Sequence, residues 1–217
     1  MKLYDFAYSP NSRKVRAVAH ELRIALESCH VDLLAGGSRT PAFLAINPNG
    51  RVPVLVDGDF VLWESTAIIR YLSSKRDGAL VPTSARGQAE MDRWICWQLA
   101  HLGPAMSKVA FERIVKRLTG QGPADEAAIL AGSAEFAKLT AVLESALQRR
   151  GREAEYLAGE LSLADFALAS HYSLAAACGL ELGRFERVSA WLARVLERES
   201  MKRALAEAQA TVRSNAA

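Results

Sequence analysis

The sequence predicts a mixed α/β domain over residues 1–77, a linker over residues 78–85 and an all-helical domain over residues 86–212. In the first third of the chain, strand-like alternation and helix-like periodicity occur together. After residue 85, Ala, Leu, Glu, Arg and Gln dominate, and these residues favour helices. The stretch between the two parts is rich in turn-forming residues, which is typical of a domain boundary.

A strand, a helix and a second strand are expected first. Residues 2–6 alternate between apolar and polar side chains, which predicts a strand. A helix is expected after Pro10, because apolar residues recur there at helical spacing: Val15, Val18, Ala19 and Leu22. Cys29–Leu34 predicts the second strand. A short crossover between two strands implies a parallel, right-handed pair.

The rest of the first domain predicts a short helix over Pro41–Ile46, a hairpin and a final helix. The hairpin strands, Val54–Val56 and Phe60–Trp63, flank an Asp-Gly-Asp turn. Ser65 is expected to cap the final helix as its N-cap residue. The element order is therefore βαβαββα.

The second domain is expected to contain five or six helices. Breaks are predicted where Gly and Pro interrupt the helical composition: Gly103-Pro104, residues 119–123, Gly151 and Gly183.

Composition and charge exclude several classes of protein. The chain has 217 residues and a net charge of +3, and its excess of Lys and Arg lies within residues 1–76, too small an excess to favour nucleic acid. A membrane span needs about 18 apolar residues in a row, and the apolar stretches of this sequence are far shorter. The first residues carry charge where a signal peptide would have its apolar core. We expect a soluble, cytoplasmic protein without a membrane partner. Cys29, Cys96 and Cys178 are too widely spaced to suggest a disulfide framework or a zinc site.

The first candidate site is the junction at Ser9-Pro10, before the first helix. Ser followed by Pro at the first helical position is ordinary capping chemistry, so one interpretation is that Ser9 does nothing more than cap the helix. The alternative is functional, because a hydroxyl beside the free N–H groups of a helix N-terminus suits an anion.

The second and third candidates lie around Pro53 and Glu64. Pro53 directly precedes a strand, and either a trans or a cis Val52–Pro53 bond fits; a cis bond would leave the backbone of Val52 open to an extended peptide. Glu64 and Ser65 either form a capped helix with a solvated carboxylate, or hold the ammonium and carboxylate of an α-amino acid.

These segments together resemble the cytosolic glutathione S-transferase superfamily of the serine type, with a phi- or theta-like pattern. The resemblance rests on SPNSRKVR at residues 9–16, NPNGRVPVL at residues 47–55, ESTAIIRYL at residues 64–72, and LSLADF at residues 161–166. It implies a thioredoxin-like domain that binds glutathione, followed by an all-helical domain that binds the electrophile.

The resemblance also implies a role for individual residues. Ser9 would activate the glutathione thiol, with Asn11 or Ser12 able to assist or replace it. Val52 would pair its backbone with the cysteinyl unit, next to a cis Pro53. The remaining glutathione contacts implied are Arg39 for the glycyl carboxylate, Glu64 and Ser65 for the γ-glutamyl end, and Arg51, whose position often carries Gln, Lys or another polar residue.

The function implied is glutathione transfer to an apolar electrophile in detoxification, by a homodimer with glutathione as co-substrate and no metal. The alternatives are a non-catalytic binding or regulatory protein of the same fold, and a glutathione-dependent isomerase or peroxidase. The electrophile would lie between the domains, with Ala7, Tyr8 and Pro10 on one side. Apolar residues of the helical domain would line the other side, unless they only form core packing: Met106, Val109 and Phe111. The four histidines are expected to be structural or exposed.

Overall fold

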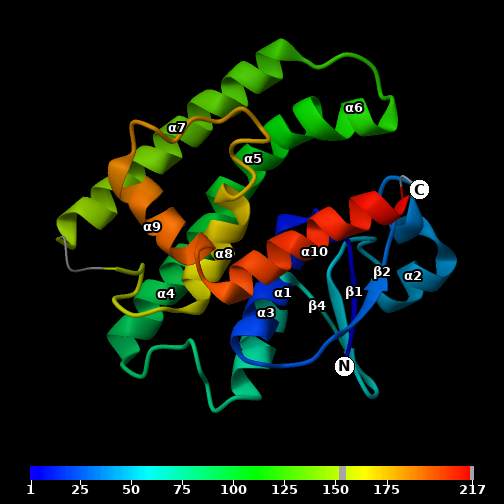
Figure 1. The fold of residues 1–217 in the computed structure, drawn as a ribbon, viewed down its shortest axis with the longest axis horizontal. Coiled ribbons are helices and arrows are strands. Elements are labelled where there is room, and N and C mark those ends of the chain that lie inside the picture. Colours follow the sequence, from blue (N-terminus) through cyan, green and yellow to red (C-terminus); the bar gives the residue numbers. More distant parts are fainter. Residues whose placement is uncertain (152–154, 216–217) are drawn as a thin grey trace. The chain divides into compact units, whose positions relative to one another are not determined.

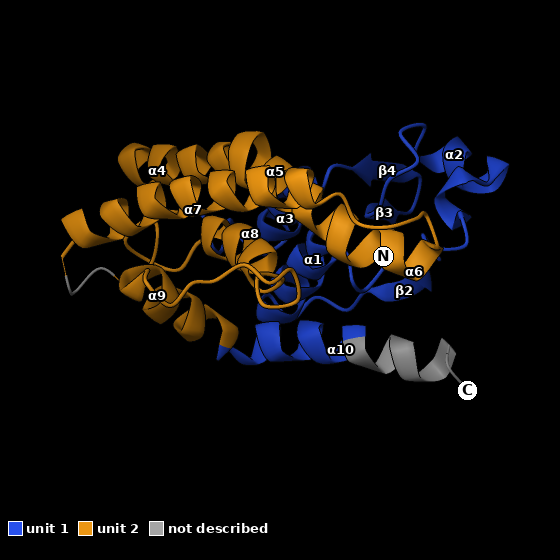
Figure 2. Cartoon of the chain, turned by 90° about the horizontal axis from the view of Figure 1, so that it is seen from above, with its two compact units in different colours: residues 1–81, 197–217 blue, residues 82–196 orange. Residues whose placement is uncertain are grey.

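The structure is a computed structural model that describes residues 1–151 and 155–215. Its contacts divide the chain into two compact units, residues 1–81 with 197–217 and residues 82–196 (Figure 2). Helix α10 (Glu199–Asn215) thus belongs by contact to the first unit, where it packs along α1 (Pro10–Glu21). The sequence-based range 86–212 places α10 in the helical domain, because its composition is helical like that of its neighbours.

The first unit is built on a four-stranded sheet of order β2-β1-β3-β4 (Figure 1). β1 (Lys2–Asp5) pairs in parallel with β2 (Glu27–His30) and antiparallel with β3 (Val54–Asp57). β3 in turn pairs antiparallel with β4 (Phe60–Trp63). Helices α1, α2 (Pro41–Ile46) and α3 (Ser65–Ser74), with the short helix η1 (Gly37–Arg39), complete the order βαβαββα, which is confirmed.

The second strand lies earlier than the sequence predicts. It covers Glu27–His30, and its register pairs Asp5 with His30, so the strand ends where β1 ends. The expected range Cys29–Leu34 is wrong because Asp32 starts a turn: its Oδ1 accepts from the N–H groups of Leu34 and Ala35 at 2.9 and 3.1 Å. Val31 is apolar for a different reason, because it packs in a buried cluster with Phe43 and Val54.

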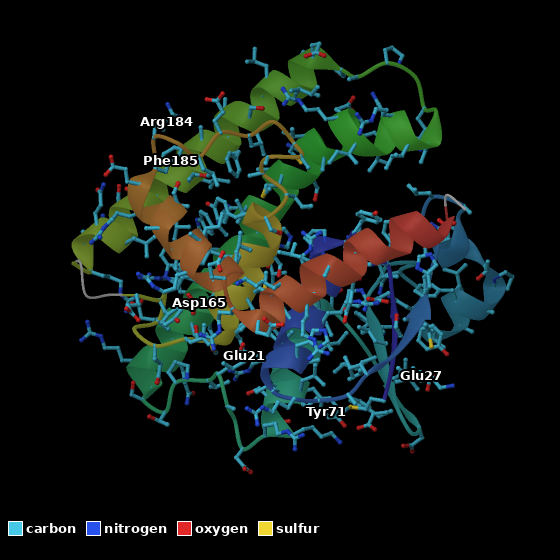
Figure 3. All side chains as sticks on the ribbon, in the orientation of Figure 1. Glu21, Glu27, Tyr71, Asp165, Arg184 and Phe185 are labelled. Carbon is cyan, nitrogen blue, oxygen red and sulfur yellow. The ribbon has the colours of Figure 1, made fainter. Side chains whose placement is uncertain are left out.

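Helices α1 and α3 bury their apolar faces against each other and the sheet. Val15 and Val18 of α1 and Ile68, Ile69 and Leu72 of α3 are fully buried, as their helical spacing predicts. Tyr71 of α3 (labelled in Figure 3) donates from its hydroxyl to Asp57 at 2.7 Å, which ties α3 to the β3–β4 hairpin.

Charged side chains attach α10 to α1. Arg16 bonds to Glu207 of α10 at 2.7 Å and also to the fully buried Asp5 of β1. His20 Nε2 lies 2.8 Å from the other Glu207 oxygen. Glu21, the last residue of α1, pairs with Arg198 just before α10.

In the second unit, one helical column runs from residue 85 to residue 119. It comprises α4 (Ala85–Trp97), the π-helical segment η2 (Gln98–Leu102), α5 (Gly103–Ala110), the π-helical segment η3 (Phe111–Val115) and α6 (Lys116–Thr119). The break expected at Gly103-Pro104 is wrong. Pro104 lacks an N–H and falls in the first turn of α5, where a proline is tolerated, and the π-helical segment η2 leads directly into that turn. Gly120, at φ +66°, does end the column, as expected.

The remaining helices of this unit are α7 (Glu126–Arg149), α8 (Leu163–Tyr172) and α9 (Glu186–Leu196). Every residue of α8 is buried. In the part of the chain that the structure describes, no helix is both long and apolar enough to cross a membrane.

Asp165 organises the start of α8 (Figure 3). Its carboxylate is fully buried and accepts from the N–H groups of Leu157 at 3.0 Å and Ser162 at 2.9 Å, and from Trp191 Nε1 at 2.9 Å. Burial raises the pKa of Asp165, and these hydrogen bonds oppose that rise. The pairing of Ser162 with Asp165 confirms the helix start expected from the sequence.

We predict that Asp165→Ala lowers the free energy of unfolding by about 3 to 5 kcal/mol, because it leaves four buried donors, including the Ser162 hydroxyl, without their acceptor. Urea denaturation followed by tryptophan fluorescence measures the change. Glu135→Ala is the control: this carboxylate lies on the surface of α7, 3.7 Å from Lys138, and its loss should cost less than about 0.5 kcal/mol. Equal losses in both variants would contradict the role of Asp165.

Candidate functional site

The three sequence motifs of the first unit meet at one edge of its sheet. Because β3 runs antiparallel to both β1 and β4, the end of β1, the start of β3 and the end of β4 lie at the same edge. The chain leaves β1 there toward Ser9, enters β3 there through Pro53, and leaves β4 there toward Glu64. Residues more than fifty positions apart are thereby brought together.

Ser9 occupies the N-cap position of α1 but does not use its side chain as a cap. Its backbone N–H donates to Phe6 O at 2.8 Å, and its carbonyl accepts from Arg13 N at 2.9 Å. Within residues 1–151 and 155–215, no hydrogen bond to the Ser9 hydroxyl is found, and the residue is partly exposed. The capping interpretation therefore does not account for this hydroxyl, which is available to a ligand.

Asn11 and Ser12, the two possible substitutes for Ser9, differ in access. Ser12 is fully buried, and its hydroxyl accepts from the N–H of Phe6 at 3.4 Å, so it lies beneath the surface and cannot touch a ligand directly. Asn11 is half-buried, and its Oδ1 accepts from Ser65 Oγ at 3.2 Å. Of these two residues, Asn11 is therefore the more accessible to a ligand.

The Val52–Pro53 peptide bond is cis, as the resemblance implies and contrary to the trans alternative. The loop before it is organised by the buried Asn47, whose Nδ2 donates to Arg51 O at 2.6 Å. Arg51 and Arg39 are both exposed. Arg39 lies against the loop that carries Arg51. A Cβ atom added to Gly50, the residue directly before Arg51, would lie 2.7 Å from Arg39 Nη1. Two cations thus border one side of the site.

Helix α3 begins one residue earlier than the sequence predicts, because Ser65 was expected to be its N-cap residue. Glu64 is the N-cap residue of α3, at φ +72°, and Ser65 is the first residue inside the helix. A non-glycine residue at such a φ is strained, and strain of this kind is concentrated at functional sites. Glu64 is exposed, whereas Ser65 is 5 % exposed.

Lys14 is a member of this site that the sequence analysis missed. It is fully buried, and its Nζ donates to Ser65 Oγ at 3.1 Å and to Thr66 Oγ1 at 3.4 Å. Burial lowers the pKa of Lys14 to about 7, against the opposing effect of Glu64. The signal was present in the sequence, since Lys14 stands four residues before the buried Val18 and so lies on the buried side of α1.

The residues expected to line the electrophile site are only partly accessible. Met106 and Val109 are buried in the second unit, where a Cβ on Gly132 of α7 would lie 2.7 Å from Val109 Cγ2. Both side chains are therefore part of the helix packing of this unit. Phe111 and Tyr8 are exposed.

Two of the histidines are held in hydrogen bonds. His171 is buried with Nδ1 3.1 Å from Ala167 O and Nε2 3.2 Å from Gln98 Nε2, and His20 contacts Glu207. Among the described residues, no group of three or more His, Cys, Asp or Glu side chains is placed to hold a metal ion.

Comparisons with known proteins identify relatives over most of the chain. A family model described as "Glutathione S-transferase, N-terminal domain" matches residues 3–79. Glutathione S-transferase 3 of Zea mays is 40% identical over 169 residues, which cover 76% of this chain and 73% of that protein.

Solved structures agree with these matches. Glutathione transferase F7 of Populus trichocarpa is 27% identical with a TM-score of 0.86, over 95% of this chain and 98% of that one. The theta class glutathione S-transferase of Xanthomonas axonopodis pv. citri, solved with glutathione bound, is 31% identical with a TM-score of 0.84, over 94% of this chain and 96% of that one.

We predict that Lys14 makes stability depend on pH. Its pKa is lower in the folded protein than in the unfolded chain, so between about pH 7 and pH 10 the unfolded state binds one more proton and stability rises with pH, by at most about 1.4 kcal/mol per pH unit. Urea denaturation of the wild type and Lys14→Met at several pH values isolates this contribution. The stability of the wild type relative to the variant should rise across this range; a constant difference would contradict the assignment.

Proposed function

Because the chain belongs to the glutathione S-transferase family, we propose that glutathione binds at the sheet edge of the first unit with its sulfur at the Ser9 hydroxyl. The protein is a glutathione transferase. The observation that carries the assignment of the site is the meeting of Ser9, the cis Pro53 and the start of α3 at one edge.

The hydroxyl of Ser9 is sufficient to ionise the thiol. A cysteine thiol has a pKa of about 8.5, and lowering it by about two units requires roughly 2.7 kcal/mol of selective stabilisation of the thiolate. A hydrogen bond to a charged acceptor supplies roughly 1.5 to 3 kcal/mol, and a helix N-terminus adds about 0.3 to 1 kcal/mol. Ser9 lies at the N-terminus of α1, so both contributions act at one atom. Ser9 acts as a hydrogen-bond donor and no base is needed.

The other glutathione contacts follow from the charges around the site. An extended tripeptide can pair its cysteinyl backbone with Val52, beside the cis Pro53. The γ-glutamyl end then meets Glu64 and Ser65 at the start of α3, where a carboxylate is favoured by the helix dipole and an ammonium by Glu64. Arg39 or Arg51 takes the glycyl carboxylate. Ser12 is omitted because it is buried.

Bound in this way, the thiolate attacks an apolar electrophile, and catalysis comes from ionisation of the sulfur and from proximity. Tyr8 is exposed one residue before Ser9, with its ring 5.5 Å from that of Phe6. It is the side chain that we assign to the electrophile in the first unit.

We predict that Ser9→Ala lowers kcat at least tenfold with a modest change in the KM for glutathione, because one charge-assisted hydrogen bond to sulfur is lost. The pKa of the bound thiol, followed by ultraviolet absorbance of the thiolate, should rise toward that of free glutathione. Ser74→Ala, an exposed serine of α3 that bonds to Tyr71 O, serves as the control and should match the wild type. Unchanged turnover in Ser9→Ala would transfer the role to Asn11.

We also propose that the protein is a homodimer. The edge strand β4 exposes three large apolar side chains, Phe60, Val61 and Trp63, each by 38–44 %. Exposed apolar side chains grouped on an outer strand such as β4 are typical of a protein–protein interface.

Light scattering coupled to gel filtration should give twice the mass of the 23.6 kDa chain, and Val61→Lys should weaken the association. A monomeric wild type at concentrations of tens of micromolar would refute the dimer. A dimer unaffected by Val61→Lys would remove β4 from its interface.

A further inference from the structure

The burial of Lys14 is costly for folding. Lysine is seldom fully buried, and an ammonium group removed from water must be compensated by partners. Among the partners of Lys14 Nζ are two neutral hydroxyls, those of Ser65 and Thr66. Its location adds to the cost, because the free N–H groups at the start of α3 also carry positive partial charge. An anion bound at the start of α3 would be attracted both by the Lys14 ammonium and by these N–H groups.

Lys14 also fixes the orientation of the Ser65 hydroxyl. A serine hydroxyl has one proton to donate and two lone pairs. In Ser65 one lone pair accepts from Lys14 Nζ, and the proton points to Asn11 Oδ1 at 3.2 Å. Lys14 and Asn11 lie three residues apart on one face of α1, so a single rigid helix holds the hydroxyl from two sides.

We propose that Lys14 is a positioning residue of the glutathione site: it orients the Ser65 hydroxyl from beneath and supplies the positive charge that attracts the α-carboxylate of the γ-glutamyl unit. Lys14 is fully buried and acts through Ser65 without touching the ligand. The inference rests on the proposed function, from which it takes the assignment of Ser65 to that carboxylate.

The charge of Lys14 makes binding of this carboxylate depend on pH. Glu64 faces Lys14 from the start of α3 and raises its pKa, while burial lowers that pKa to about 7. Other charged groups on packed elements pair with each other: Asp5 of β1 and Glu207 of α10 with Arg16, Glu207 with His20, and Glu21 with Arg198. Arg13 and Arg70 are the further cations of α1 and α3.

The sign of the effect follows from linkage. A bound carboxylate favours the charged ammonium, so it raises the pKa of Lys14, and by reciprocity affinity is highest at low pH and falls as pH rises through and above about 7. The neutral amine that remains at higher pH still bonds to Ser65 but no longer attracts the anion.

The test compares two probes that lack a free thiol, so that ionisation of sulfur cannot contribute. One is S-methylglutathione, and the other is the same compound with the α-carboxylate of its γ-glutamyl unit replaced by hydrogen. Their Kd values are measured by calorimetry between about pH 6 and pH 8 on the full-length protein. We expect the Kd of S-methylglutathione to rise about fivefold or more across this range relative to that of the second probe.

Lys14→Met is the matching variant, and Lys138→Met, which removes an exposed lysine of α7, is its control for net charge. At about pH 6, Lys14→Met should bind S-methylglutathione about tenfold more weakly than the wild type, bind the second probe unchanged, and lose the pH dependence. Lys138→Met should match the wild type. A purely structural role would weaken both probes equally.

Two results overturn the inference. The first is that the Kd values of the two probes change with pH in parallel on the wild type, a measurement that does not depend on any variant folding. The second is that Lys14→Met binds S-methylglutathione with the affinity and the pH dependence of the wild type. Ser65→Ala separates this failure from that of the proposed function. If Ser65→Ala binds S-methylglutathione as the wild type does, the assignment of the γ-glutamyl site is wrong. If it binds more weakly while Lys14→Met does not, only the role of Lys14 is wrong.

Discussion

The direction of the strands β1, β3 and β4 is the constraint on which the site depends. Antiparallel pairing places the end of β1, the start of β3 and the end of β4 at one edge, so the segments at Ser9, Pro53 and Glu64 become neighbours. A parallel β3 would carry Pro53 to the opposite edge of the sheet. Each motif contributes a different chemical group, and the sheet alone gives them a common location.

Helix α1 links this edge to the rest of the first unit through its charged residues. Lys14 reaches Ser65 and Thr66 on one side, while Arg16 and His20 reach Glu207 of α10 on another. Among these charged side chains Lys14 is fully buried, and a buried charge contributes little net stability but costs much when its partner is removed. The helix therefore combines apolar packing against α3 with a set of polar contacts that fix where its N-terminus lies. A displaced N-terminus would move Ser9 and Asn11 together.

Polar contacts also organise the second unit, although its helices are mostly apolar in their packing. Asp165 gathers the backbone at Leu157 and Ser162 and the indole of Trp191, so that the start of α8 is held from three directions. In the column over residues 85–119, Pro104 lies in the first turn of α5, directly after the π-helical segment η2, and the helix continues through it. Both features concern the pairing of backbone N–H and C=O groups, which the amino-acid composition of the helices does not reveal.

The order of elements, the β3–β4 hairpin, the capped start of α8 and the three motifs can all be predicted from the amino-acid sequence, because they depend on periodicity and on turn and capping chemistry within a few residues. The packed structure was needed to show that Ser12 is buried while Asn11 is half-buried, that β2 ends at His30, that α10 packs on α1, and that Lys14 bonds to Ser65. These depend on contacts between distant segments. Burial and pairing across fifty or more residues are fixed by the packing of whole elements, which no local pattern contains.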